Sequence, residues 1–121
     1  MKKIMAYLLI ASVLMPAFGQ ERAFLTKLQV EELAIGKKWI HIRTTDTNQV
    51  SWDIRSGGQI FANNFTSGSR EAGLWSINDQ GQLCVKWRGS SPDRCVGLLK
   101  QTLQMVDAKD LRGIYADLAI E

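Results

Sequence analysis

The chain is poor in the residue types that most often carry chemistry, because its 121 residues include only one histidine, two cysteines and two prolines. A structural zinc site needs four ligands, usually cysteine and histidine in close pairs, and this chain offers three in total. The cysteines lack the Cys-x-x-Cys spacing of redox sites, and the Gly-x-Ser-x-Gly sequence of serine hydrolases is absent. We therefore expect a protein that is not an enzyme and has no metal, no cofactor and no catalytic residue.

Only one long apolar run is present, at residues 4–15. Two lysines precede it, Pro16 ends it, and Ala17 and Gly19 place small residues at the −3 and −1 positions of a cleavage site. This layout is typical of a secretory signal peptide, and the run is shorter than the roughly 20 apolar residues of a transmembrane helix. We predict a signal peptide at residues 1–19, a mature chain that begins at Gln20, no membrane insertion after signal removal, and a periplasmic or secreted location.

The chain also has only a small excess of positive over negative charge. The chain has 15 basic and 12 acidic residues, and loss of Lys2 and Lys3 with the signal peptide leaves 13 basic residues. The remaining basic residues lie among acidic ones, as in the neighbours Arg70 and Glu71. Nucleic-acid binding needs a basic surface that neutralises phosphates, so we do not expect a nucleic acid as partner.

What the chain does contain is a regular alternation of apolar and polar residues. Residues 20–121 have the length of a single domain. Segment 24–39 predicts a short helix that Thr26 caps and Gly36 ends. From Trp39 onward the apolar period is two, which predicts strands at 39–44, 49–55, 59–65, 72–77, 82–88 and 94–100. We predict a mainly β fold in which a short N-terminal helix precedes an antiparallel meander that curls into a small barrel or half-barrel.

Residues 107–121 fit two structures. Leu111, Ile114, Tyr115 and Leu118 have helical spacing, but the same segment also alternates as a strand. Gly113 weakens a helix by about 1 kcal/mol relative to alanine. The pattern favours a final hairpin that turns at residues 108–110, and a helix stays open as the alternative.

The two cysteines flank one turn, and in an exported protein such a pair most simply forms a disulfide. If Cys84 faces Cys95, Lys86 lies opposite Asp93 on the same face as an opposite-charge pair. The apolar residues of segment 83–87 then point to the other face. Because this register keeps apolar side chains on one side, we predict a Cys84–Cys95 disulfide on the outside of the sheet.

Two segments resemble a known family. The sequences "LTKLQVEELAIGKKW" and "GGQIFANNFTSGSREAGLWSINDQGQLCVKW" are similar to the domain of unknown function 995 family of small exported bacterial proteins. The matching positions are Gly58, Gly73, Trp75, Gly81, Leu83, Cys84, Trp87 and Cys95. The resemblance covers most of residues 25–100 and implies a secreted β-rich fold. It implies no established activity and no catalytic residues.

Large aromatic residues are numerous for so small a domain, since the mature chain holds four tryptophans. They either fill a core or line a cleft at the mouth of a curled sheet. Strand alternation places Trp52 and Trp87 on the concave side. The candidate ligand-binding residues are Trp52, Trp75, Trp87, Phe61 and Arg70.

The single histidine, His41, alternates with Ile40 and Ile42. This pattern predicts a polar strand face and a solvated imidazole, with no role in metal or triad chemistry. Two functions remain. The first is an exported domain that binds a small apolar ligand. The alternative is a protein-interaction module, such as an envelope or host-facing factor or an inhibitor of a cell-wall enzyme. An enclosed cavity would favour the first, and a filled core with an exposed patch the second.

Overall fold

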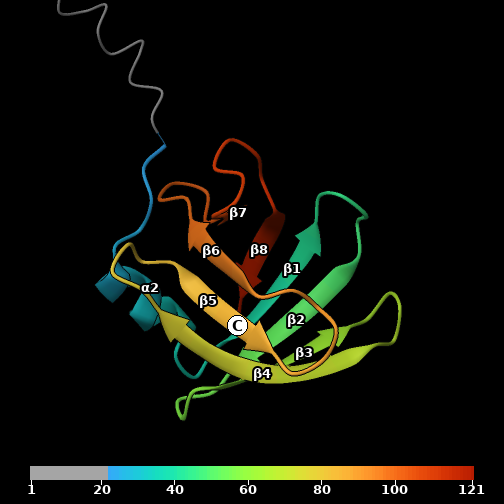
Figure 1. The fold of residues 1–121 in the computed structure, drawn as a ribbon. Helices are drawn as coiled ribbons and strands as arrows, with labels where there is room; N and C mark the ends of the chain where they lie inside the picture. The colour runs from blue at the N-terminus through green and yellow to red at the C-terminus, as the bar shows by residue number, and fades with distance from the viewer. Residues whose placement is uncertain (1–21) are drawn as a thin grey trace, which may run out of the picture.

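The computed structural model describes residues 22–121, so the predicted signal peptide and the start at Gln20 lie outside the described residues. The described chain contains one helix followed by eight strands (Figure 1). These elements are α2 (Lys27–Ala34), β1 (Lys38–Arg43), β2 (Gln49–Ile54), β3 (Gln59–Asn64), β4 (Arg70–Ile77), β5 (Leu83–Trp87), β6 (Arg94–Leu98), β7 (Met105–Asp107) and β8 (Ala116–Ile120). No helix of the described chain has the length and apolar character needed to cross a membrane.

Helix α2 forms where the capping pattern predicts it. The Thr26 hydroxyl accepts a hydrogen bond from the Gln29 N–H, and the Gln29 side chain accepts one from the Thr26 N–H. This reciprocal pair satisfies two N–H groups that a helix start otherwise leaves unpaired. Gly36 follows the helix with a φ of 76°. The helix precedes the strands as predicted, but it is not at the N-terminus of the chain, because 26 residues come before Lys27.

The strands form a closed barrel in which each strand pairs antiparallel with the next. Closure depends on the first and last strands, where Trp39 lies opposite Ile120 and Arg43 lies opposite Ala116. The backbones of Lys38 and Glu121 exchange two hydrogen bonds beyond this ladder. The prediction of a small barrel or half-barrel is therefore met by a fully closed barrel, which leaves no long unpaired edge.

The barrel core lies at the end that α2 covers. Val30 and Ala34 of α2 are buried with inward residues of the strands, among them Ile54 and Leu98. The Trp39 indole N–H donates to the Leu33 carbonyl at 2.9 Å and so links β1 to the helix. In Figure 1, α2 lies at the left and the β3–β4 and β5–β6 loops project to the right. The helix end is thus packed, and the opposite end is free to hold a cavity.

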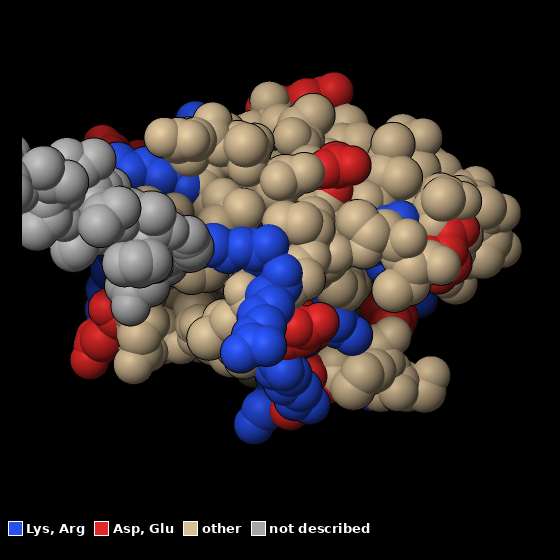
Figure 2. Space-filling view, turned by 90° about the horizontal axis from the view of Figure 1, so that it is seen from above, with Lys and Arg blue, Asp and Glu red and all other residues tan. Residues whose placement is uncertain are grey.

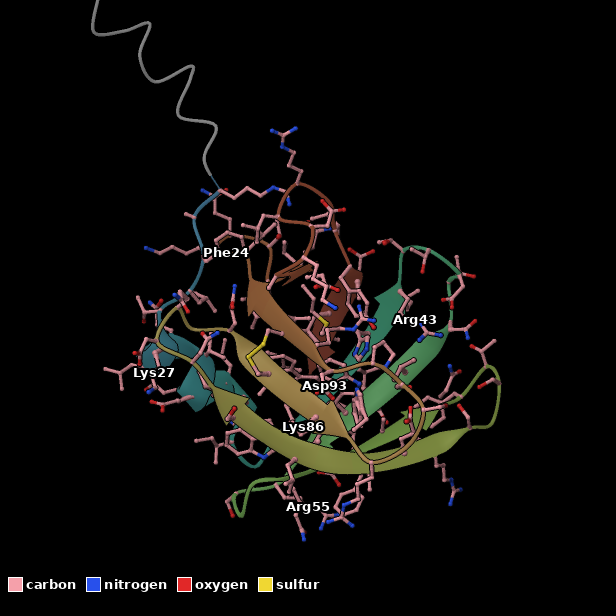
Figure 3. The ribbon with its side chains drawn as sticks, in the orientation of Figure 1. Phe24, Lys27, Arg43, Arg55, Lys86 and Asp93 are labelled. Atoms are coloured by element: carbon pink, nitrogen blue, oxygen red, sulfur yellow. A yellow bond between two sulfur atoms is a disulfide. The ribbon has the colours of Figure 1, made fainter. Side chains whose placement is uncertain are left out.

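The predicted disulfide is present. Cys84 and Cys95 face each other in the β5–β6 ladder, and their sulfurs are bonded at 2.07 Å (Figure 3). Lys86 and Asp93 follow this register and line one shallow groove on the outer face. The predicted charge pair does not form, because the ion pairs within residues 22–121 join other partners. The ladder ends at the pair Val85–Arg94, so the ladder does not hold the next pair, Lys86 and Asp93, opposite each other.

The last part of the chain forms a hairpin, as the strand pattern favours. Strands β7 and β8 pair only through Met105 and Ala116, and residues 108–115 connect them. The turn is therefore longer than the predicted one at 108–110. Leu111 is exposed, whereas Ala116 is buried on the inner face of β8. The helical spacing in this segment corresponds to no helix.

The prediction for His41 is wrong. Its side chain is only 1% exposed and points into the barrel together with Trp39, while Ile42 points outward and is 47% exposed. Both faces of β1 carry apolar residues, so alternation alone did not reveal which face is inside. The large Trp39 ring fills the packed end of the barrel, and every second residue after it must then also face inward.

Candidate functional site

A pocket of about 350 Å³ opens at the end of the barrel opposite α2. We call it the mouth pocket. Ligand pockets in proteins typically measure roughly 300–1,000 Å³ and lie in such barrel mouths. The residues that line it are His41, Arg43, Asn48, Val50, Trp52, Ala62, Asn64, Ser67, Ser69, Glu71, Trp87, Ser91, Pro92, Arg94 and Tyr115. The inner part of this lining is mostly aromatic or apolar, and the outer part is polar.

Three rings form the inner end of the pocket. The Trp52 and Trp87 rings meet edge to face, with their centroids 5.8 Å apart. The His41 ring meets Trp52 in the same manner at 4.8 Å. Because Trp52 is 3% exposed and contacts Trp87 directly, no ligand fits between these two rings. The rings therefore separate the packed core from the mouth pocket and form a floor of two indole rings and one imidazole.

Gly73 makes room for one of these rings. It lies opposite Trp87 in the β4–β5 ladder. A Cβ atom at position 73 would lie 2.5 Å from the Lys86 carbonyl oxygen and 3.1 Å from an atom of the Trp87 ring. Real Cβ atoms do not approach a backbone oxygen so closely, so only glycine lets the Trp87 ring lie across β4. The glycine of the "AGLW" segment thus positions a floor residue of the pocket.

His41 is the buried polar group of this floor. Within residues 22–121, neither of its ring nitrogens has a hydrogen-bond partner. Burial lowers the pKa of the imidazole from 6.5 to about 4, and the charge of Arg43 lowers it further. The Trp39 backbone, which is close enough to favour the charged imidazole but lacks hydrogen-bond geometry to either ring nitrogen, raises the pKa. His41 is therefore neutral at physiological pH, with one nitrogen as donor and the other as acceptor. A buried polar group without a partner is unfavourable by about 1–3 kcal/mol, so it favours a ligand that supplies one.

Two arginines stand at one side of the rim. Arg43 donates through Nε and Nη2 to the two carboxylate oxygens of Asp46, at 3.1 and 2.8 Å. A hydrogen bond from the Asn48 N–H, with this pair, holds the pKa of Asp46 below its ordinary value. Arg94 donates through Nη1 to Asp107 at 2.6 Å, and its guanidinium lies 4.4 Å from the centre of the Tyr115 ring. Both guanidinium groups are thus held in place, and each has further N–H groups directed elsewhere.

Hydrogen bonds also order the loops around the mouth. Glu71 of β4 accepts from both the N–H and the hydroxyl of Ser91, which ties the β5–β6 loop to the β4 wall. The Asn64 side chain accepts from the N–H groups of Thr66 and Ser67 and shapes the β3–β4 loop. A rim of this kind is already formed before any ligand arrives, which reduces the ordering that binding must supply.

The structure separates the five ligand-binding candidates of the sequence into three places. Trp52 and Trp87 line the mouth pocket. Trp75 lies toward the packed end, where its indole N–H donates to the Arg55 carbonyl at 2.7 Å. Phe61 and Arg70 lie on the outside of the barrel, where they line a shallower groove of about 630 Å³ that we call the outer groove. The Arg55 guanidinium covers the Phe61 ring at 4.9 Å from its centre.

Sequence reasoning missed the polar residues of the mouth pocket. Arg43 and Arg94 end β1 and begin β6, so they are far apart in the sequence and meet only because the barrel closes. A usable signal existed in the parity, because Arg94 lies two residues before the inward Val96. Among residues 22–121, no three His, Cys, Asp or Glu side chains group as ligands for a metal ion.

Charge on the surface is mixed. Figure 2 views one face of the molecule and shows Lys and Arg side chains in a group with acidic side chains beside it, while much of the remaining face is uncharged. Figure 3 places Arg43 at the loop end of β1, Lys27 beside α2, and Arg55 at the bottom of the view, below β4. Lys27 and Arg55 therefore do not extend the positive charge of the mouth pocket.

Comparisons of the chain with protein-family models, with curated proteins and with solved structures found no match. The resemblance to the domain of unknown function 995 family stays a prediction. Inferences about function therefore depend on the chemistry of the mouth pocket.

Proposed function

We propose that the protein binds a small molecule in the mouth pocket and acts as a carrier or sensor rather than as an enzyme. The observation that carries this proposal is a cavity of about 350 Å³ whose floor holds two tryptophan rings and the buried, unpartnered imidazole of His41. Aromatic walls with a few convergent polar groups are the usual lining of ligand sites. Because the lining is mixed, we propose a ligand with both an apolar ring and polar groups, in place of the small apolar ligand predicted from the sequence.

We also propose that the protein is periplasmic or secreted. The signal-like residues 1–19 and the Cys84–Cys95 disulfide support this location, since disulfides are typical of oxidising compartments. The intact mass of the protein recovered outside the cytoplasm tests it. A chain that begins at Gln20 is expected, and a product that retains residues 1–19 would contradict the proposal.

Ligand binding is testable with the two tryptophans of the floor. The oxidised protein is titrated with a panel of soluble aromatic and aliphatic molecules while tryptophan fluorescence and the indole N–H resonances are recorded. A ligand of the mouth pocket should quench fluorescence and shift the Trp52 and Trp87 resonances together. If no compound of the panel moves either resonance, the carrier proposal is wrong.

A matched pair of variants separates the mouth pocket from the outer groove. Trp87→Leu removes a floor ring, and Phe61→Leu removes an aromatic ring of the outer groove. Trp87→Leu should weaken binding by roughly tenfold or more, the effect of about 1.4 kcal/mol, and Phe61→Leu should leave binding unchanged. The opposite result would place the ligand on the outside of the barrel.

The outer groove keeps the protein-interaction module as a second candidate function. Phe61 is 38% exposed, and Arg70 and Lys38 beside it offer charge. A partner of the envelope, of a host or of the cell-wall machinery would bind there through Phe61. Loss of partner binding in Phe61→Leu but not in Trp87→Leu would favour this candidate over the carrier.

A further inference from the structure

We infer that the mouth pocket takes a small aromatic acid that carries a hydroxyl group at the end of its ring opposite the carboxylate. The hydroxyl lies at His41 on the floor, the ring lies over Trp52 and Trp87, and the carboxylate lies at Arg43 and Arg94 on the rim. This inference rests on the proposed function and names the chemical class of its ligand.

The floor selects an uncharged hydrogen-bonding group. His41 is 1% exposed, and its nitrogens have no partner within residues 22–121. Its neighbours on the floor are the Trp52 ring at 4.8 Å and the Tyr115 ring at 6.3 Å. An anion placed at the His41 nitrogens would lose its hydration and would meet only a neutral imidazole there, which is unfavourable. A hydroxyl can both donate to and accept from a neutral imidazole, so it fits this end of the pocket.

The rim selects an anionic oxygen group. Arg43 uses Nε and Nη2 for Asp46, and Arg94 uses Nη1 for Asp107. A guanidinium has five N–H groups, so each arginine keeps further donors, and both arginines line the mouth pocket. Asp46 and Asp107 do not line the mouth pocket but a neighbouring cleft. Arg43 and Arg94 line both the cleft and the mouth pocket, so the mouth pocket contains two guanidinium groups and one carboxylate, Glu71.

The only carboxylate of the lining forms no ion pair with either arginine within residues 22–121. Glu71 belongs to β4, whereas Arg43 belongs to β1 and Arg94 to β6. Arg43 and Arg94 also line a neighbouring cleft together, and Glu71 is not part of that cleft. Both Glu71 oxygens accept hydrogen bonds from Ser91. Glu71 therefore holds the β5–β6 loop, and a ligand carboxylate is directed toward Arg43 and Arg94.

The spacing of the two selective ends matches one aromatic ring. His41 and Arg43 are successive inward residues of β1, so their Cα atoms are about 6.7 Å apart along the strand. A benzene ring with substituents at opposite positions has a comparable length. The flat Trp52 and Trp87 rings, which form the floor beside His41, favour a planar ligand, because aromatic rings pack edge to face or offset-stacked.

Calorimetric titration with three probes tests the inference. The probes are 4-hydroxybenzoate, benzoate, which lacks the hydroxyl, and 4-hydroxybenzyl alcohol, which lacks the carboxylate. We expect 4-hydroxybenzoate to bind roughly tenfold more tightly than either of the other two, since each lost hydrogen bond to a polar site changes affinity by about that factor.

Variants assign each preference to its residue. His41→Phe should remove the preference for 4-hydroxybenzoate over benzoate, and His41→Gln, which keeps a donor and an acceptor, should retain part of it. Arg43→Gln should remove the preference for the carboxylate. Arg55→Gln is the matched control, because Arg55 pairs with Asp53 on the outside of the barrel and should leave all three affinities unchanged.

The outcomes distinguish this inference from the proposed function. Equal affinities of the three probes, or a hydroxyl preference that survives in His41→Phe, would overturn the inference while binding in the pocket stands. The same holds if other members of the compound panel shift the Trp52 and Trp87 resonances and none of the three probes does. If no compound shifts them, both the inference and the proposed function fail.

Discussion

At the scale of single residues, the mouth pocket depends on side chains that the barrel forces inward. His41 follows Trp39 by two positions and is buried for that reason, although an imidazole gains nothing from an apolar neighbourhood. Trp52 has a double role. Its ring stacks on the Trp39 ring of the packed core, with the ring centroids 6.5 Å apart, and it also faces the pocket beside His41. These two residues allow the residue-scale predictions.

The neutral state of His41 makes stability depend on pH. The pKa of His41 is about 4 in the folded protein, against 6.5 in the unfolded chain, so the unfolded state binds the proton more tightly. Stability is therefore complete above pH 6.5 and falls as the pH drops from 6.5 toward 4, by an amount on the order of 3 kcal/mol. Urea unfolding at pH 7 and pH 4.5 measures the loss.

The control for this pH effect is His41→Phe, which cannot take up a proton and should lose less stability over the same range. The charged groups that line the same pocket are Arg43, Glu71 and Arg94, with Tyr115 as a further titratable group. They are unchanged in the variant, so their effects cancel in the comparison. An imidazole resonance that titrates near pH 6.5 in the folded protein would contradict the prediction.

Truncation of Trp52 should destabilise the whole domain. The ring is 3% exposed and packs against Trp39, Trp87 and His41. Trp52→Ala is expected to lower the free energy of unfolding by about 3–5 kcal/mol through lost burial and a cavity. Chemical denaturation measures this, with Phe65→Ala as a control on an exposed ring of the β3–β4 loop. A similar loss in both variants would mean that the two rings are equally buried.

At the scale of elements, each hairpin brings one set of residues to the mouth. The β5–β6 hairpin carries Trp87, Ser91 and Arg94, and its disulfide holds the register that turns Trp87 and Arg94 inward. If β6 slipped by one residue relative to β5, Arg94 would turn to the outer face. The disulfide lies on the outside, so it contributes to the site only by setting this register.

Removal of the disulfide should therefore weaken the domain without abolishing it. In the chain-entropy model, a loop of this length contributes about 3 kcal/mol. The double variant Cys84→Ala/Cys95→Ala should lose about that amount in a urea titration and keep the far-ultraviolet spectrum of the barrel. Thiol labelling of the denatured wild-type protein should find no free cysteine. Full labelling at both positions together with bound zinc would contradict the disulfide.

At the scale of the whole molecule, the defining event is closure between β1 and β8. Lys38 and Glu121 exchange two backbone hydrogen bonds, and the Thr44 N–H donates one to the Tyr115 carbonyl. Because hydrogen-bonded and non-hydrogen-bonded pairs alternate along an antiparallel ladder, the pair Ile40–Ala119 is also hydrogen-bonded. Closure brings Arg43 of β1 to the same rim as Arg94 and Tyr115. An open half-barrel would have the same strands but no enclosed mouth pocket.

A proline in the last strand distinguishes a closed barrel from an open sheet. In an open sheet β8 would be an edge strand and could tolerate proline, whereas in the closed barrel Ala119→Pro removes a ladder hydrogen bond to β1. We expect a loss of stability greater than the ~1 kcal/mol of one hydrogen bond, measured by urea unfolding. Ala119→Val, which keeps the N–H at the same exposed site, is the control and should be close to neutral. A proline variant as stable as the valine variant would show that β8 does not close the barrel.

The sequence alone determined the features that depend on neighbouring residues. The helix at 27–34 follows from its Thr26 cap and from Gly36, and the strands follow from a period of two with turn residues between them. Gly81 has a left-handed conformation, with a φ of 78°, in the turn between β4 and β5. The Cys84–Cys95 pairing also follows from local register, because both residues belong to one hairpin. Capping, alternation and turn geometry act over a few residues, so they can be identified without the fold.

Only the tertiary structure decided the closure of the barrel, the inner face of β1 and the composition of the mouth pocket. Ile40 and Ile42 compete with Trp39 for the inside, and the choice depends on the space above α2, which no local pattern contains. The sequence predicts Phe61 and Arg70 as ligand-binding residues together with Trp52, yet they lie on the other side of the sheet. His41, Arg43 and Arg94 share one pocket because eight strands close on themselves, and contacts between residues about fifty positions apart depend on that closure.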